Sequence, residues 1–216
     1  MIQSELILPF TAILITLTAL TMLVILDWRI CLIVLAIQYI GVFLVVSQTS
    51  PFAVAAAKLI AGWISAAVLG MAIINNKELQ EQLGSGQKHT FSDSDEEQII
   101  QTPGILGIAF RILTAGLISL TIVSQLPALI NAFPQWTMLQ TWSGLILIGF
   151  GLIKLSFTTE PFHILLALLT LLAGFEILYA ALDKTMLSAG LFATVNLILA
   201  LVGAYLLTAP QMEEEA

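Results

Sequence analysis

The chain has 216 residues, of which 59% are hydrophobic and only 10% are charged, whereas soluble domains have about 25% charged residues. This composition excludes an ordinary soluble globular domain and indicates an all-α polytopic membrane protein. The net charge of −7 comes mainly from "DSDEE" at 93–97 and "EEE" at 213–215, so it gives no reason to expect nucleic-acid binding. The single cysteine, Cys31, excludes an intrachain disulfide and a cysteine-based metal site.

Seven apolar runs are long enough to cross a bilayer, which needs about 20 residues. We expect transmembrane helices at approximately 6–26, 30–48, 51–74, 104–128, 138–157, 161–182 and 186–208. The first run follows "MIQSEL", which has no cation, and no A-x-A-like cleavage site comes after it, so we expect a retained span. The polar stretch 77–103, rich in glycine, serine and charges, predicts a mobile loop.

Cations set the expected orientation. Arg29, Lys77 and Lys88 lie in the first and third connections, and Arg111 lies near the start of the fourth run. Positive residues favour the cytoplasmic side. We therefore expect an integral protein of a prokaryotic cytoplasmic (inner) membrane, with its N-terminus outside and its C-terminus cytoplasmic. Lys184 is the one connecting cation on the opposite side.

The two halves of the chain share a pattern of polar residues. A shift of 138 residues places Gln38 on Glu176 and Lys58 on Asn196. Each is about 10 residues, or roughly 15 Å, from an expected turn near 48 or 186, which is half of a ~30 Å hydrocarbon core. All four are therefore expected near the bilayer midplane. Because identity between the halves is low, the evidence for this repeat is geometric.

Small residues accompany these polar positions on one helical face. They are Ala55, Gly62, Ser65 and Ala66 around Lys58, and Ala193, Ala200, Gly203 and Ala204 around Asn196. Small residues allow close helix packing in lipid, so we expect both faces to contact other helices.

The expected architecture is a parallel 3+1+3 arrangement. Its parts are a first three-helix unit at 1–75, an acidic polar cytoplasmic loop at 76–103, a connecting transmembrane helix at 104–130, a second three-helix unit at 131–210 and an acidic C-terminal tail at 211–216.

Glu176 stands alone in the apolar stretch "LLAGFEILYAAL". A charge at the bilayer centre costs about 2.5–3.5 kcal/mol on insertion scales. A glutamate avoids much of this cost by taking up a proton, and a lysine such as Lys58 avoids it by losing one. Two interpretations follow: both residues belong to a proton or ion path, or Glu176 is a neutral acid that donates one interhelical hydrogen bond.

Other polar residues have simpler interpretations beside the functional one. Lys154 and Arg111 lie near the expected inner edge, where long cations anchor helices, and Gln38 and Asn196 need only a hydrogen-bond partner. His163 either shuttles protons or is a solvated residue near a helix end. The candidate residues for a proton or ion path are Glu176, Lys58, Gln38, Asn196 and Lys154.

We find no nucleophile–base pair, phosphate-binding glycine loop or metal-ligand cluster in the sequence. "GFGLIK" contains G-x-G, but it lies inside an apolar run without a strand–turn–helix context. Trp63 and Tyr179 are expected to pack. We therefore expect no catalysis by this chain alone, no cofactor and no metal.

The stretch "AGFEILYAALDKTMLSAGLFATVNLILALVGAYLL" resembles the last two helices of the small K-type (4L-type) membrane subunit of respiratory complex I. In that family a three-helix unit carries a glutamate on its second and third helices. Glu176 matches the first, and Asn196 lies near the second. The whole chain is similar to hydrogenase 4 component E, a longer K-like subunit, because "WRICLIVLAIQ" carries Arg29 and Gln38 and "AAAKL" carries Lys58. The acidic residues at 92–97 and the tail are not part of the family pattern.

The resemblance implies two K-like three-helix units in a membrane-arm subunit without flavin, iron–sulfur cluster or quinone headgroup. Such subunits lie among antiporter-like subunits and contribute midplane polar residues to a proton (or sodium) path. The complex would be related to complex I, to membrane hydrogenases or to Mrp-type antiporters. Two alternatives stay open: an independent secondary transporter with a midplane site, which parallel repeats also allow, and a purely structural membrane partner.

Overall fold

The computed structural model describes residues 2–86 and 105–214, and the side chains of 9–76 and 107–208. This part of the chain is all-helical. Its seven helices are α1 (Ile2–Val24), α2 (Trp28–Val46), α3 (Phe52–Gly86), α4 (Ile105–Ala132), α5 (Met138–Ser156), α6 (Pro161–Leu182) and α7 (Met186–Glu214). Six of them are long and apolar enough to cross a membrane, and α1 is apolar over Pro9–Val24. The prediction of an all-α chain is confirmed for the described residues, and six of the seven predicted spans have the length and hydropathy of a membrane helix.

Local sequence explains where the helices begin. The Asp27 side chain accepts a hydrogen bond from the Arg29 amide at 2.9 Å and starts α2. Thr137 and Gln140 form a capping box at the start of α5, and Pro161 occupies the first turn of α6. Before α7, the amide and hydroxyl of Thr185 donate to Asp183 and hold the pKa of that exposed carboxyl below its usual value.

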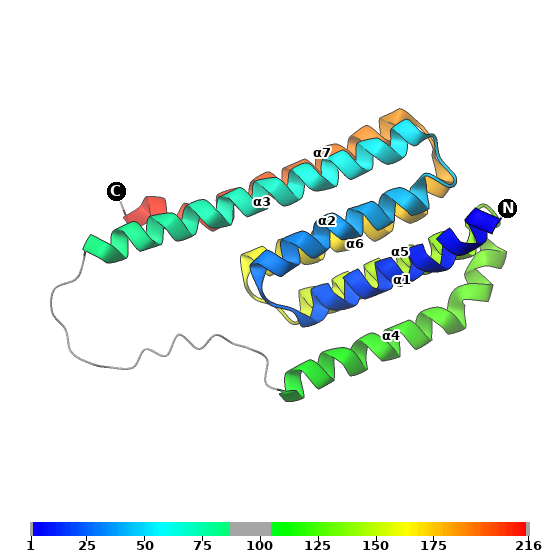
Figure 1. Ribbon diagram of the computed structural model, residues 1–216, viewed down its shortest axis with the longest axis horizontal. Coiled ribbons are helices and arrows are strands. Elements are labelled where there is room, and N and C mark those ends of the chain that lie inside the picture. The colour runs from blue at the N-terminus through cyan, green and yellow to red at the C-terminus, as the bar shows by residue number, and fades with distance from the viewer. Residues whose placement is uncertain (1, 87–104, 215–216) are drawn as a thin grey trace.

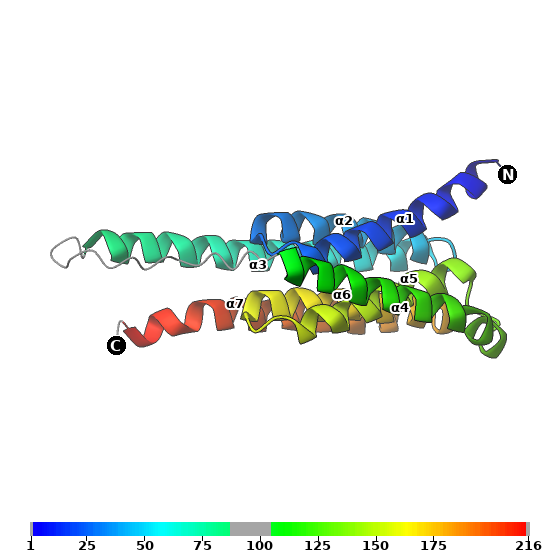
Figure 2. The same cartoon turned by 90° about the horizontal axis from the view of Figure 1, so that it is seen from below.

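The helices form two layers of three (Figures 1 and 2). α1, α2 and α3 lie in one layer and α5, α6 and α7 in the other, in the same order. The layers meet helix against helix, because α1 packs on α5, α2 on α6 and α3 on α7. The two members of each pair run in the same direction (Figure 1). α4 packs on α5 and α1, at the side of the bundle away from α3 and α7.

We name the two ends of the bundle by what they carry. The basic end holds the connections 25–27 and 157–160, together with Arg29, Arg111 and Lys154. The opposite end holds the connections 47–51, 133–137 and 183–185. Because the described helices alternate in direction, α1 begins at the opposite end and α7 ends at the basic end (Figure 1).

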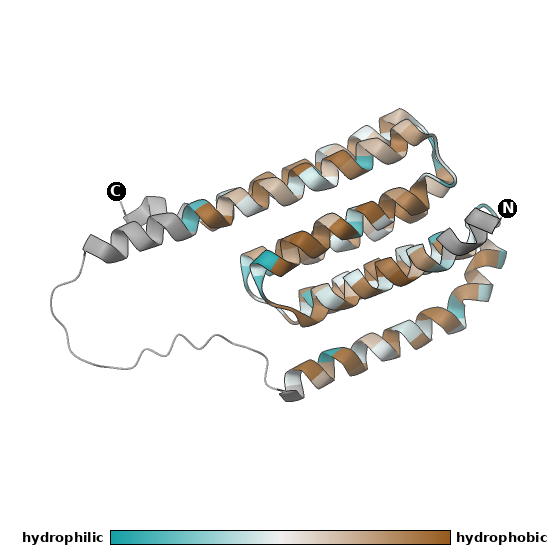
Figure 3. Ribbon diagram, in the orientation of Figure 1, coloured by the Kyte–Doolittle hydropathy of each residue, from teal (hydrophilic) through white to brown (hydrophobic). Residues whose placement is uncertain are grey.

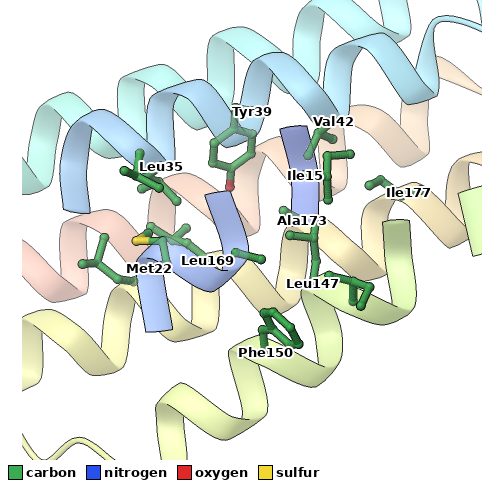
Figure 4. Close-up of a cluster of buried hydrophobic side chains, with 14 of the residues drawn as sticks. Ile15, Met22, Leu35, Tyr39, Val42, Leu147, Phe150, Leu169, Ala173 and Ile177 are labelled. Carbon is green, nitrogen blue, oxygen red and sulfur yellow. The ribbon is translucent and has the colours of Figure 1, made fainter. Parts of the chain in front are cut away.

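The core lies between the layers, where apolar side chains of α1, α2, α5 and α6 meet (Figure 4). Ile15, Leu35, Leu147 and Ile177 are fully buried there. Hydrophobic residues follow one another along every helix (Figure 3), and many of them are exposed; Leu187, for example, is 81% exposed. A bundle that is hydrophobic inside and outside is suited to lipid rather than water.

Small residues let the helices approach closely. A Cβ at Gly174 of α6 would lie only 2.6 Å from the carbonyl oxygen of Gly144 in α5. A Cβ at Gly62 would overlap the Tyr39 ring, and one at Gly203 would overlap Leu165. The predicted contact of both small-residue faces with other helices is therefore confirmed at these glycines.

Two helices are longer than predicted. α3 continues to Gly86, ten residues into the stretch 77–103 expected to be a loop, and α7 continues to Glu214, into the expected tail. Residues 87–104, which include Lys88 and the acidic segment 93–97, lie outside the described residues. Helix propensity explains the first extension, because Lys, Glu, Leu and Gln in "KELQEQL" are good helix formers.

Candidate functional site

A buried ion pair joins the two layers. The Lys58 Nζ of α3 lies 3.3 Å from the Glu176 Oε2 of α6. The side chains are 3% and 0% exposed, respectively. Both charges would be costly alone in lipid, so pairing is the simplest way for the fold to hold them. Both residues were candidates for a proton or ion path, and the structure brings them into contact.

Two further residues extend the pair into a hydrogen-bonded cluster. Asn196 Nδ2 of α7 donates to Glu176 Oε1 at 2.6 Å. The Tyr39 hydroxyl of α2 donates to Asn196 Oδ1 at 3.1 Å. We call Tyr39, Lys58, Glu176 and Asn196 the polar cluster. One side chain comes from each of α2, α3, α6 and α7, so the cluster ties both layers together.

Aromatic rings shield one side of the cluster. The Lys58 Nζ lies 4.9 Å from the centroid of the Phe192 ring, a cation–π contact. Tyr179 packs edge-on against the same ring, with centroids 5.2 Å apart, as its predicted packing role requires. Trp63, also expected to pack, is 48% exposed, although its Nε1 donates to the Ala36 carbonyl.

Gln38 is not part of the polar cluster. It is fully buried, and among the described residues neither its amide nitrogen nor its amide oxygen has a hydrogen-bond partner. Tyr39, the next residue, reaches the cluster instead. A shift of 137 residues places Tyr39 on Glu176, whereas the predicted shift of 138 places Lys58 on Asn196. No single ungapped shift therefore aligns all four residues of the polar cluster.

The polar cluster lies at unequal distances from the ends of its helices. Lys58 is six residues after the first residue of α3, and Glu176 is six residues before the last residue of α6. Asn196 is ten residues after the first residue of α7 and still reaches Glu176. The position of these residues at the bilayer midplane stays a prediction.

Lys154 lies elsewhere, at the basic end. It is buried, and its Nζ donates to the Met22 carbonyl at 2.5 Å and lies 3.9 Å from the Cys31 sulfur. Arg111 donates to the neighbouring Leu23 carbonyl at 3.1 Å. Both cations thus satisfy carbonyls of the last turn of α1, where helix dipoles favour positive charge. This agrees with the anchoring interpretation and does not place Lys154 in contact with Glu176.

Of the two interpretations of His163, a proton shuttle and a solvated residue near a helix end, the structure contradicts the second. Its side chain is buried, with 4% of its surface exposed. Its Nε2 lies 3.5 Å from Glu160 Oε2, whose side chain is 71% exposed. The Phe162 ring packs edge-on against the His163 ring, with centroids 5.2 Å apart.

The polar cluster has the chemistry of a proton-handling site. A proton can move between Nζ and Oε2 within the pair, so the pair exists either as two charges or as two neutral groups without a change in net charge. Protonation of Glu176 from elsewhere would release Lys58 from its partner. Among the described residues no group of three or more His, Cys, Asp or Glu side chains could hold a metal ion.

Comparisons with known proteins returned nothing for this chain: no protein-family description, no curated protein and no solved structure matched it.

Proposed function

We propose that this chain is a non-catalytic membrane-arm subunit of an ion-translocating complex related to complex I, to membrane hydrogenases or to Mrp-type antiporters. In this proposal the polar cluster forms part of a proton (or sodium) path, and antiporter-like subunits are the partners. The observation that carries the proposal is the buried Lys58–Glu176 pair, which bridges the two layers inside apolar helices. Intramembrane ionisable residues most often mark ion paths.

The packing of the helices supports the inferred 3+1+3 organisation. Each of the first three helices packs on the helix four positions later in the chain, and the paired helices run in parallel. In this proposal α1–α3 and α5–α7 are the two K-like units, and α4 is the extra crossing that lets a three-helix unit be repeated in the same direction.

The second candidate is an independent secondary transporter. Transporter sites near the midplane are typically formed by discontinuous helices. The four helices of the polar cluster are continuous through it, which favours the subunit proposal. The test is purification in mild detergent from the native membrane. A subunit elutes with large antiporter-like partners, whereas elution of this chain alone, or as a homo-oligomer, would overturn the proposal.

The proposed orientation places the basic end in the cytoplasm, in a prokaryotic inner membrane. Arg29 and Arg111 lie at that end, and cations favour the cytoplasmic side. A cysteine introduced by Ser94→Cys in a Cys31→Ser background tests it. We expect no labelling by an impermeant thiol reagent added to intact cells; efficient labelling would reverse the orientation.

A further inference from the structure

The Lys58 ammonium contacts groups of two different kinds. The first is the Glu176 carboxylate, whose Oε2 lies 3.3 Å from Nζ. The second is the face of the Phe192 ring of α7, whose centroid lies 4.9 Å from Nζ. The carboxylate can take up a proton and lose its charge, whereas the ring cannot. The lysine therefore has one partner whose charge can change and one whose electrostatic character is fixed.

The hydrogen bonds around Glu176 have a single direction. Lys58 Nζ donates to Oε2, and Asn196 Nδ2 donates to Oε1 at 2.6 Å. The Tyr39 hydroxyl donates to Asn196 Oδ1 and so holds the amide with its nitrogen toward Glu176. Both carboxyl oxygens thus accept hydrogen bonds, and an ionised carboxylate is a group that only accepts. The arrangement suits a carboxylate that faces an ammonium.

The Phe192 ring is itself held by aromatic neighbours on α6. Tyr179 packs against it edge-on, with centroids 5.2 Å apart, and the Phe175 centroid lies at 6.2 Å. The Lys58 side chain is 3% exposed, so little water competes with its contact to the ring. A cation–π contact is strongest in such desolvated surroundings, and it stabilises an ammonium rather than a neutral amine because it depends on the positive charge.

We propose that Phe192 is a positioning residue that keeps Lys58 charged beside Glu176, so that the resting pair is a carboxylate and an ammonium rather than two neutral groups. When a proton from elsewhere binds Glu176, the carboxyl becomes neutral and the ammonium keeps the ring as its partner. Loss of that proton restores the ion pair. The proposal rests on the proposed function, because it assigns the charge state in which the polar cluster receives a proton.

A comparison of Phe192→Leu in two backgrounds separates the cation–π contact from packing. In the wild-type background the substitution removes both. In the variant Lys58→Met with Glu176→Gln, which carries no charge at these two positions, it changes packing alone. We expect Phe192→Leu to lower the folding equilibrium constant, measured in mixed detergent micelles, at least about fivefold more in the wild-type background. Equal effects in the two backgrounds would overturn the proposal.

Further variants control this comparison. Phe192→Tyr keeps the ring face, so its effect should be the same in both backgrounds. Phe175→Leu removes a neighbouring ring that is 50% exposed and lies 6.2 Å from Phe192, and its effect should also be the same in both. If Phe192→Leu does not fold, Phe192→Met, which also lacks a ring, takes its place in the comparison.

Infrared spectroscopy of the purified full-length chain in lipid at neutral pH measures the charge state of the pair. The difference spectrum between the wild type and Glu176→Gln isolates the carboxyl group of Glu176. We expect an ionised carboxylate band that the variant lacks; a protonated carboxyl band in its place would contradict the proposal. Neither measurement depends on pumping. Wild-type proton uptake by assembled Glu176→Gln would instead contradict the proposed function and leave both results standing.

Discussion

Two buried lysines of this protein are held in different ways. Lys58 faces a carboxylate on another helix, 3.3 Å away, whereas Lys154 donates to a main-chain carbonyl at the end of α1. The first lysine is one of two opposite charges that can exchange a proton. The second completes the hydrogen bonding of a helix terminus. The difference indicates that a buried cation implies ion movement only when its partner can also change its charge.

The largest loss of stability should come from replacing only one partner of the Lys58–Glu176 ion pair. Lys58→Met or Glu176→Leu leaves one buried charge without its partner, which costs about 3–5 kcal/mol. The double variant removes both charges and should recover most of that loss. The free energy of unfolding, measured in mixed detergent micelles for the single and double variants, gives these losses. A loss in the double variant equal to the sum of the two single losses would mean that the two side chains do not interact.

A smaller effect should come from closing the space beside the polar cluster. Gly62→Leu would push a side chain into the Tyr39 ring, and overpacking of this kind costs about 1–3 kcal/mol. Gly203→Leu should behave similarly, because Leu165 occupies the space beside it. Gly190→Leu is the matched control, since a Cβ there meets nothing within 4 Å. The yield of assembled complex measures the effect, and normal assembly of both disruptive variants would contradict the packing described for α3 and α7.

Lys154→Met tests the comparison of the two lysines at the second lysine. It leaves carbonyls of α1 without a donor but no charge without a partner, so we expect a loss of about 1–2 kcal/mol. This is less than for Lys58→Met. The same unfolding measurement decides, and a loss for Lys154→Met as large as that for Lys58→Met would remove the distinction between the two lysines.

The smallest effect concerns the edge of the polar cluster. Tyr39→Phe keeps the ring against Gly62 and removes the hydroxyl that donates to Asn196. Interhelical hydrogen bonds in membranes average about 0.6 kcal/mol, so we expect a destabilisation of that size. A double-mutant cycle with Asn196→Ala measures the coupling, and a coupling of zero would exclude this contact.

The sequence was sufficient to predict the helices and insufficient to predict how they face one another. Apolar runs and polar connections placed α6 at 161–182, as observed. The position of Lys58 and Glu176 along the bundle was partly predictable. Lys58 follows the connection 47–51 and Glu176 precedes the connection 183–185, and both connections lie at the opposite end. The pairing of the two residues was not predictable, since it depends on α3 packing on α7 and α2 packing on α6, helices that are far apart in the sequence.

Helix rotation explains the errors at individual residues. In α2 nearly every residue is apolar, so periodicity does not indicate which side faces the other helices. Gln38 was therefore chosen over Tyr39, although a tyrosine hydroxyl inside an apolar helix is also a group that needs a partner. His163 is buried although it lies near the start of α6, so a position near a helix end does not by itself predict exposure.

Proton uptake by the assembled complex in vesicles tests the central claim, that Glu176 exchanges protons, most directly. Glu176→Gln keeps the shape and an acceptor for Lys58 but cannot ionise, so we expect uptake per assembled complex to fall at least about tenfold, with Glu176→Asp retaining more. The paired variant Lys58→Met with Glu176→Gln controls for the unpartnered lysine and should also fail to pump. Wild-type uptake by Glu176→Gln together with impaired uptake by Glu176→Asp would contradict the account and leave the ion pair with a purely structural role.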